Sequence, residues 1–266
     1  MMATRSNTIQ NAWICVLRSV EFRLSRMTRK ITDLRRLAEL KGTVADWLDR
    51  HAANTVDLLK ILSSADIRVI YDIGANRGQF TSLARALFPN AEVHAFEPLE
   101  RHRIAFLDLV TEWRNVSIHP IALGCLEGRA NLGVMSASDS SSLLPITAKG
   151  QNDWGISKYE DVEVDVASLD EYARINKLST ADLIKLDVQG YELEVLRGAR
   201  KALKAASWVL CEVSAEEYYE GQALFGDVVR FMKENDYEPF AFGGQGAFSV
   251  SLAQMDVLFR RSNCVE

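Results

Sequence analysis

The spacing of the hydrophobic residues changes near residue 67, and this change predicts two parts of the chain. Between residues 31 and 50, apolar side chains recur near helical spacing, which indicates an amphipathic helix, and a second short helix is expected over 55–62. From residue 69 onward, short apolar runs alternate with segments of helical spacing. We therefore expect residues 1–65 to form a helical N-terminal extension and residues 66–266 to form the main domain.

The second part alternates strand patterns with helix patterns. Seven segments resemble buried strands, at 69–73, 91–96, 116–121, 182–188, 208–213, 237–242 and 256–260. Between them lie segments of helical spacing, at 79–88, 100–110, 169–175, 192–205 and 226–235. A strand–helix–strand order predicts parallel pairing through right-handed crossovers. The expected fold class is therefore α/β, a doubly wound seven-stranded sheet with helices on both faces.

Residues 122–168 interrupt this alternation. They contain strand-like pieces at 130–135 and 162–166 around a serine-rich stretch at 136–142. A loop of this length without regular structure would be unusual in a compact domain. We therefore expect a β-hairpin insertion that carries part of the function.

Composition narrows the class of protein. The chain has 266 residues, 48% of them hydrophobic and 25% charged, which is typical of a globular protein. No stretch offers the roughly 20 apolar residues of a membrane span. The four cysteines lie far apart without a C-x-x-C pair, so neither a zinc site nor a disulfide framework is indicated. With no secretory signal in view, we expect a cytoplasmic protein with free thiols and no bound metal.

Charge is distributed unevenly along the chain. Net charge is −5, but residues 1–41 hold nine basic and three acidic residues, which gives +6 there and −11 for the remainder. An acidic body is a poor binder of nucleic acid, because phosphate neutralisation needs clustered lysine and arginine. The basic segment is either a solvated helical arm or a weak contact site for an anionic membrane, a partner or RNA.

The first candidate for chemistry is the turn after the first predicted strand, Asp72-Ile73-Gly74-Ala75-Asn76-Arg77-Gly78. Gly74 and Gly78 would let the backbone turn and approach a ligand closely. The carboxylate of Asp72 would repel a pyrophosphate and attract an ammonium group. The G-x-x-x-G spacing also differs from the G-x-G-x-x-G of dinucleotide binders. The pattern therefore favours a zwitterionic amino-acid cofactor over NAD, with an ordinary βα turn as the alternative.

Acidic residues end three further strands. Glu97, 25 residues after Asp72, could accept hydrogen bonds from both ribose hydroxyls of an adenosine. Asp187, in Ile184-Lys185-Leu186-Asp187-Val188-Gln189-Gly190, would face the same crevice as Gly74 and could accept a substrate proton or help to hold a metal ion; the alternative is a helix cap. Glu212 is either a second active-site carboxylate or another helix cap.

These residues together resemble the FkbM family of S-adenosylmethionine-dependent methyltransferases. The resemblance covers about residues 67–260 and rests on Asp72 to Phe80, Ala95-Phe96-Glu97-Pro98, Ser141-Ser142-Leu143, Ser168-Leu169-Asp170, Ile184 to Ala199, Glu212 and Asp256-Val257-Leu258-Phe259. It implies the seven-stranded Rossmann-like methyltransferase sheet, with its last strand antiparallel. It also implies O-methylation of a hydroxyl, on a sugar of a glycan or glycoconjugate or on a polyketide-type small molecule.

The resemblance assigns roles to individual residues. Asp72, Gly74, Asn76 and Gly78 would hold the methionine end of S-adenosylmethionine, Glu97 its ribose, and Ser142 would reach the cofactor from the insertion. Asp187 is the leading general base and Glu212 the second. Gln189 is a departure, because relatives often carry Glu there. Aromatic residues of the insertion and of the loop 214–225 (Trp154, Tyr159, Tyr218 and Tyr219) would stack on a sugar or simply pack.

Three other functions stay open from the sequence. An NAD-dependent oxidoreductase is disfavoured by Asp72 and by the missing third glycine. A methyltransferase of the same fold could act on nitrogen or on another small molecule. A catalytically silent cofactor-binding scaffold is the third, and Gln189 is the residue that points to it.

Overall fold

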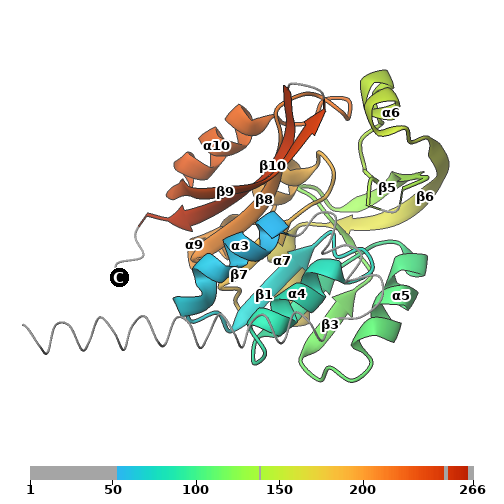
Figure 1. Ribbon diagram of the computed structural model, residues 1–266. Coiled ribbons are helices and arrows are strands. Elements are labelled where there is room, and N and C mark those ends of the chain that lie inside the picture. The colour runs from blue at the N-terminus through green and yellow to red at the C-terminus, as the bar shows by residue number, and fades with distance from the viewer. Residues whose placement is uncertain (1–52, 138, 249–250, 263–266) are drawn as a thin grey trace, which may run out of the picture. The chain divides into compact units, whose positions relative to one another are not determined.

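The computed structural model describes residues 53–137, 139–248 and 251–262, and within them a seven-stranded sheet carries the site (Figure 1). The strand order is β3-β2-β1-β7-β8-β10-β9. The strands are β1 (Val69–Ile73), β2 (Glu92–Phe96), β3 (Val116–His119), β7 (Leu183–Leu186), β8 (Trp208–Ser214), β9 (Tyr237–Phe248) and β10 (Ser251–Arg261). The predicted seven-stranded α/β sheet is therefore confirmed.

Strand direction follows the expected scheme. β1 pairs in parallel with β2 on one side and with β7 on the other, and β2–β3 and β7–β8 are also parallel. β10 runs antiparallel to both of its neighbours, β8 and β9, as the family resemblance implies. The chain moves outward from β1 in one direction through β2 and β3, then resumes on the other side at β7. The order thus reverses between β1 and β7, where such sheets bind ligands.

Helices cover both faces of the sheet (Figure 1). On one face lie α3 (Ala53–Ile61) with the short 3-10 turn η2 (Leu62–Ser64), α4 (Gln79–Leu87) and α5 (Glu100–Val110). On the other lie α7 (Leu169–Asn176), α8 (Glu192–Arg197), α9 (Arg200–Ala205) and α10 (Phe225–Glu234). The central strands are apolar on both faces because both are covered; all four residues of β7 are buried.

The insertion between β3 and α7 forms its own small sheet. β5 (Gly128–Met135) pairs antiparallel with β6 (Lys158–Ala167), and the two-residue strand β4 (Ala122–Leu123) adds in parallel. α6 (Ala148–Trp154) lies in the connection at the far end of the hairpin (Figure 1). The predicted β-hairpin is therefore confirmed, with a helix in its connection that the sequence reading left out.

Two elements differ from the sequence-based expectation. The single helix predicted over 192–205 is two helices, because the backbone breaks after Arg197 and α9 begins separately. The carboxylate of Asp170 accepts hydrogen bonds from the backbone amides of Lys201 and Ala202, at 2.7 and 2.9 Å, and thereby caps the start of α9. β9 and β10 are longer than expected and pair with each other through several register shifts.

The described residues begin with α3, which the sequence reading placed in the N-terminal extension. α3 contacts β9, β10 and α4, and it buries apolar side chains, among them Leu58 and Leu59. The remainder of the expected extension, residues 1–52, lies outside the described residues. Within the part of the chain that the structure describes, none of the helices has both the length and the apolar character to cross a membrane.

Candidate active site

A cavity lies outside the carboxyl ends of β1, β2 and β7. The empty space within it is about 670 Å³, a volume that includes open solvent at its mouth. The β-hairpin insertion supplies one wall and the sheet the others. The lining residues that bear on function are Ile73, Gly74, Asn76, Phe96, Glu97, His102, Leu123, Leu132, Asp139, Ser141, Leu143, Asp187, Gln189 and Tyr191.

The turn after β1 packs tightly against its surroundings. Gly74 has φ +77°, and a Cβ built there would lie 1.9 Å from the backbone carbonyl oxygen of Asp187. Gly78 has φ +93°, and its Cβ would meet the side chains of Phe106 and Leu109 on α5 at 3.0 Å. Glycine at both positions is thus explained by backbone and helix packing. Gly74 and Asn76 line the cavity, whereas Gly78 lies behind it.

Glu97 is held in place at the end of β2. Its side chain is 5% exposed, and its two carboxylate oxygens accept hydrogen bonds from the backbone amides of Asn76 and Leu99, each at 2.9 Å. His102 Nδ1 lies 3.4 Å from the same carboxylate. A carboxylate has about four acceptor positions, so Glu97 keeps capacity for hydroxyl groups in the cavity that it lines.

Asp72 lies elsewhere than the sequence reading placed it. Its side chain is fully buried, 3.3 Å from the ammonium group of Lys185, and it accepts a 2.6 Å hydrogen bond from the hydroxyl of Thr81. It does not line the cavity. The two side chains meet because Asp72 and Lys185 are register partners on adjacent strands. The Asp72 carboxylate therefore faces Lys185 rather than a ligand ammonium group.

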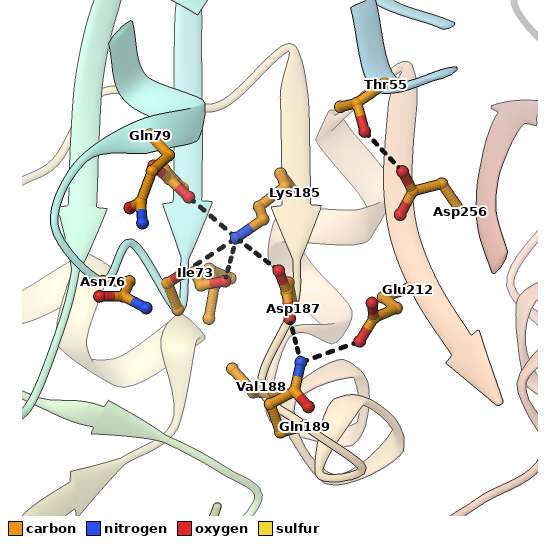
Figure 2. Close-up of polar contacts among 12 residues, drawn as sticks. Thr55, Ile73, Asn76, Gln79, Lys185, Asp187, Val188, Gln189, Glu212 and Asp256 are labelled. Carbon is orange, nitrogen blue, oxygen red and sulfur yellow. Dashed lines mark hydrogen bonds and ion pairs between the residues drawn. The ribbon is translucent and has the colours of Figure 1, made fainter. Parts of the chain in front are cut away.

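Lys185 is a residue that the sequence reading missed. Its ammonium group also donates to the backbone carbonyl of Gly74 at 2.9 Å and lies 3.7 Å from Asp187 (Figure 2). Burial by itself would lower the pKa of Lys185, but the carboxylates of Asp72 and Asp187 outweigh that effect and raise it. A charged residue inside the apolar run 183–186 was the available signal.

The side chain of Gln189 bridges the carboxyl groups of Asp187 and Glu212 (Figure 2). The amide nitrogen of Gln189 donates to Asp187 Oδ1 at 2.8 Å and to Glu212 Oε2 at 3.0 Å. Asp187 lines the cavity with its side chain 39% exposed, whereas Glu212 lies behind Gln189 and does not line it. Of the two predicted bases, Asp187 is therefore the one that lines the cavity.

Several buried carboxyl groups surround this pair. Burial, together with the charges of Asp187 and Asp256, raises the pKa of Glu212 well above its usual value. Burial raises the pKa of Glu192 to about 7, although hydrogen bonds from backbone amides lower it in part. Burial likewise raises the pKa of Asp256 to about 6, and the hydrogen bond from Thr55 opposes this rise. Such shifts are common in active sites, where charged groups are concentrated.

Among the described residues, the insertion lines the cavity with Leu132, Asp139, Ser141 and Leu143 rather than with aromatic rings. Ser142 is buried and its hydroxyl donates to the backbone carbonyl of Gln189 at 2.6 Å, so it supports the turn while Ser141 and Asp139 line the cavity. Tyr218 and Tyr219 are buried, and Trp154 stacks on Tyr218 with ring centroids 4.6 Å apart. These three rings pack against one another, and Tyr159 is 73% exposed.

Comparison with known proteins places this geometry in a family. The model of the methyltransferase FkbM domain matches residues 72–239, which is more than half of the chain. The 2-O-methyltransferase NoeI of Sinorhizobium fredii is 26% identical over 161 residues, covering 58% of this chain and 66% of that protein. The hexuronic acid methyltransferase AglP of Haloferax volcanii is 28% identical over 171 residues, covering 64% and 66%.

The matches to these two relatives thus span slightly less than two thirds of the length of each. Among solved structures, the magnesium protoporphyrin IX methyltransferase of Synechocystis PCC 6803 aligns with a TM-score of 0.47 at 14% identity, covering 88% of this chain and 91% of that one. Family membership rests on the domain match and on the motifs that line the cavity. The chain belongs to the methyltransferase FkbM domain family.

Proposed function

We propose that this protein is an S-adenosylmethionine-dependent O-methyltransferase that acts on a sugar hydroxyl in a glycan or glycoconjugate. The observation that carries the proposal is the cavity at the β1/β7 reversal, which Glu97 lines from one strand end and Asp187 from another. Relatives named as a 2-O-methyltransferase and a hexuronic acid methyltransferase support the sugar acceptor.

The residues present fit the cofactor. Glu97 has spare acceptor positions for ribose hydroxyls, and the apolar side chains of Phe96, Leu123 and Leu132 offer a surface for a flat ring. Gly74 and Asn76 would contact the methionine end. Asp72, Gly78 and Ser142 would act indirectly, by supporting the turns that carry these contacts. When bound, S-adenosylmethionine supplies an activated methyl group.

Asp187 would perform the proton transfer. An alcohol is a weak nucleophile at neutral pH, and a positioned carboxylate that takes its proton contributes about 10²–10⁴-fold to the rate. The acceptor hydroxyl would lose its proton to Asp187 as its oxygen took the methyl group, and the bond from that methyl group to the cofactor sulfur would break to leave S-adenosylhomocysteine. The remaining work of the chain is to align the acceptor oxygen and to exclude water.

The charge of the cavity favours an uncharged acceptor. Among the described residues that line it, Glu97, Asp139 and Asp187 are acidic and none is lysine or arginine. Two cations contact this lining from behind: Lys185 lies 3.7 Å from Asp187, and Arg103 donates to the backbone carbonyl of Glu97 at 3.2 Å. An acceptor carboxylate or phosphate would be repelled here, whereas a neutral sugar would not.

The test is transfer of a radiolabelled methyl group from S-adenosylmethionine to a panel of neutral glycosides, glucuronides and simple alcohols. We expect label in the neutral glycosides, and loss of at least about 100-fold in turnover in Asp187→Asn, consistent with loss of a general base. Asp161→Asn, on the exposed strand β6, is the matched control and should transfer normally. Preferential labelling of amines, or no labelling at all, would contradict the proposal.

A further inference from the structure

Every polar atom of the Gln189 side chain is engaged. Its amide nitrogen donates to Asp187 Oδ1 and Glu212 Oε2, at 2.8 and 3.0 Å, and its Oε1 lies 3.2 Å from the hydroxyl of Tyr219, which shares its one proton between this oxygen and the carbonyl of Ser140. The orientation of the amide follows from these partners, because the reverse orientation would place its oxygen against two carboxylates. Gln189 thus links β7, β8 and the loop that contains Tyr219.

The backbone of Gln189 is held as firmly as its side chain. Its φ is 56°, a left-handed conformation that side chains with a Cβ rarely adopt. The backbone carbonyl of Gln189 accepts the hydroxyl of Ser142, and Tyr219 donates to the carbonyl of Ser140 at 2.7 Å. The first contact ties the turn to the β-hairpin insertion, and the second ties the loop that contains Tyr219 to the same insertion. A strained conformation fixed by several contacts in a ligand cavity is typical of functional sites.

The charges around Gln189 call for an uncharged donor. The carboxyl groups of Asp187 and Glu212 contact it; burial and the neighbouring Asp187, Asp256 and Glu192 raise the pKa of Glu212, and the charge of Lys185 opposes that rise. An amide gives each of the two contacting carboxylates a hydrogen bond without adding charge. A carboxylate in its place would bring three acidic groups within about 3 Å of one another, and they could not all stay ionised.

We propose that Gln189 is a positioning residue for methyl transfer, which holds the Asp187 carboxylate by one oxygen in a fixed orientation toward the acceptor. This inference rests on the proposed function. The second carboxylate, Glu212, anchors the amide from behind, and Tyr219 anchors it from the loop side. The contacts of Tyr219 with Ser140 and of Gln189 with Ser142 also hold the insertion, and with it a bound acceptor, at a fixed position relative to Asp187.

The hydrogen bonds from the Gln189 amide to Asp187 and Glu212, called the clamp below, are tested first without any acceptor. The method is NMR of protein labelled with ¹⁵N in glutamine. The chain contains seven glutamines, and the side-chain signals of Gln189 are identified by their loss in Gln189→Met or Gln189→Glu. We expect these signals to shift with pH as Glu212, whose pKa is raised, changes its protonation, and to move in both Asp187→Asn and Glu212→Gln. If the Gln189 side-chain signals changed neither with pH nor in either variant, the clamp would be refuted.

The positioning role is tested by turnover with S-adenosylmethionine and neutral glycosides over pH 5–9. Gln189→Met should lower kcat about 10–100-fold while changing KM for S-adenosylmethionine less than about twofold, as expected for loss of a hydrogen bond to a charged group. Gln189→Glu should move the acid limb of the pH profile to higher pH, because the added carboxylate opposes ionisation of Asp187. Gln151→Met, in the exposed first turn of α6, is the control and should behave as wild type.

The outcomes separate the two claims. Normal kcat and an unchanged pH profile in both Gln189 variants would overturn the positioning role while leaving the methyltransferase intact. A wild-type protein that methylates none of the glycosides would instead contradict the proposed function, and the NMR result would still decide whether the clamp exists.

Discussion

Removing the ammonium group of Lys185 should strongly destabilise the fold. In Lys185→Met, the Asp72 carboxylate stays fully buried and, among the described residues, keeps the hydroxyl of Thr81 as its hydrogen-bond partner. Breaking a buried ion pair from one side costs about 3–5 kcal/mol. For a domain of this size that corresponds to a fall of roughly 6–20 °C in the melting temperature.

A double-mutant cycle separates charge from packing. Asp72→Asn/Lys185→Met removes both charges, so it should be more stable than Lys185→Met alone, because no carboxylate is then left uncompensated. Urea unfolding at pH 7 measures the free energy of unfolding of wild type, both single variants and the double variant. Lys158→Met is the surface control, since its partner Asp161 is about half exposed, and it should change stability by less than about 1 kcal/mol.

If Lys185→Met lost no more stability than the surface control, the predicted cost of leaving the Asp72 carboxylate uncompensated would be refuted. It would also be refuted if the double variant were less stable than Lys185→Met by the full cost of Asp72→Asn. Additivity of that kind would mean that the two side chains stabilise the fold independently and that their 3.3 Å contact has no energetic consequence.

Three further predictions concern single positions. Glu192→Gln should be more stable than wild type at pH 8 but not at pH 4. The pKa of Glu192 in the folded state is raised to about 7, so the stability of the wild type falls as pH rises from about 4.5 to 7. Thermal unfolding of both proteins across this range measures the difference. Gly74→Ala should fail to fold or lose several kcal/mol of the free energy of unfolding, measured in urea. Gly221→Ala is the control, because Gly221 has a similar φ and no neighbour within 4 Å of the added Cβ, and it should lose only about 1–2 kcal/mol. Equal losses in the two variants would contradict the contact of Gly74 with Asp187. Asp187→Asn should bind S-adenosylhomocysteine within about threefold of wild type while losing turnover, so a matching loss of affinity by calorimetry would place Asp187 in cofactor binding instead.

The sheet and the positions of its acidic strand ends could be predicted from sequence because both follow from local patterns. Apolar runs ending in Asp or Glu mark the carboxyl ends of strands, and parallel strands bring those ends to one edge. Asn76, Glu97 and Asp187 accordingly line one cavity although 111 residues separate the first from the last.

The partners of these groups could not be predicted, because they depend on strand register and on long-range packing. Asp72 meets Lys185 only through the pairing of β1 with β7, which no local pattern specifies. The same holds for Gln189, which the family comparison singled out for its missing charge. Its value as a donor between Asp187 and Glu212 becomes visible only when β7 and β8 lie side by side.

The proposed function depends most directly on binding of the cofactor at Glu97. Calorimetric titration with S-adenosylhomocysteine, beside NADH, tests this binding. We expect micromolar binding of S-adenosylhomocysteine alone, weakened at least about tenfold in Glu97→Ala through loss of charged hydrogen-bond acceptors and unchanged in Glu163→Ala on the exposed face of β6. Binding of NADH, or S-adenosylhomocysteine affinity that is the same in wild type and Glu97→Ala, would contradict the central claim.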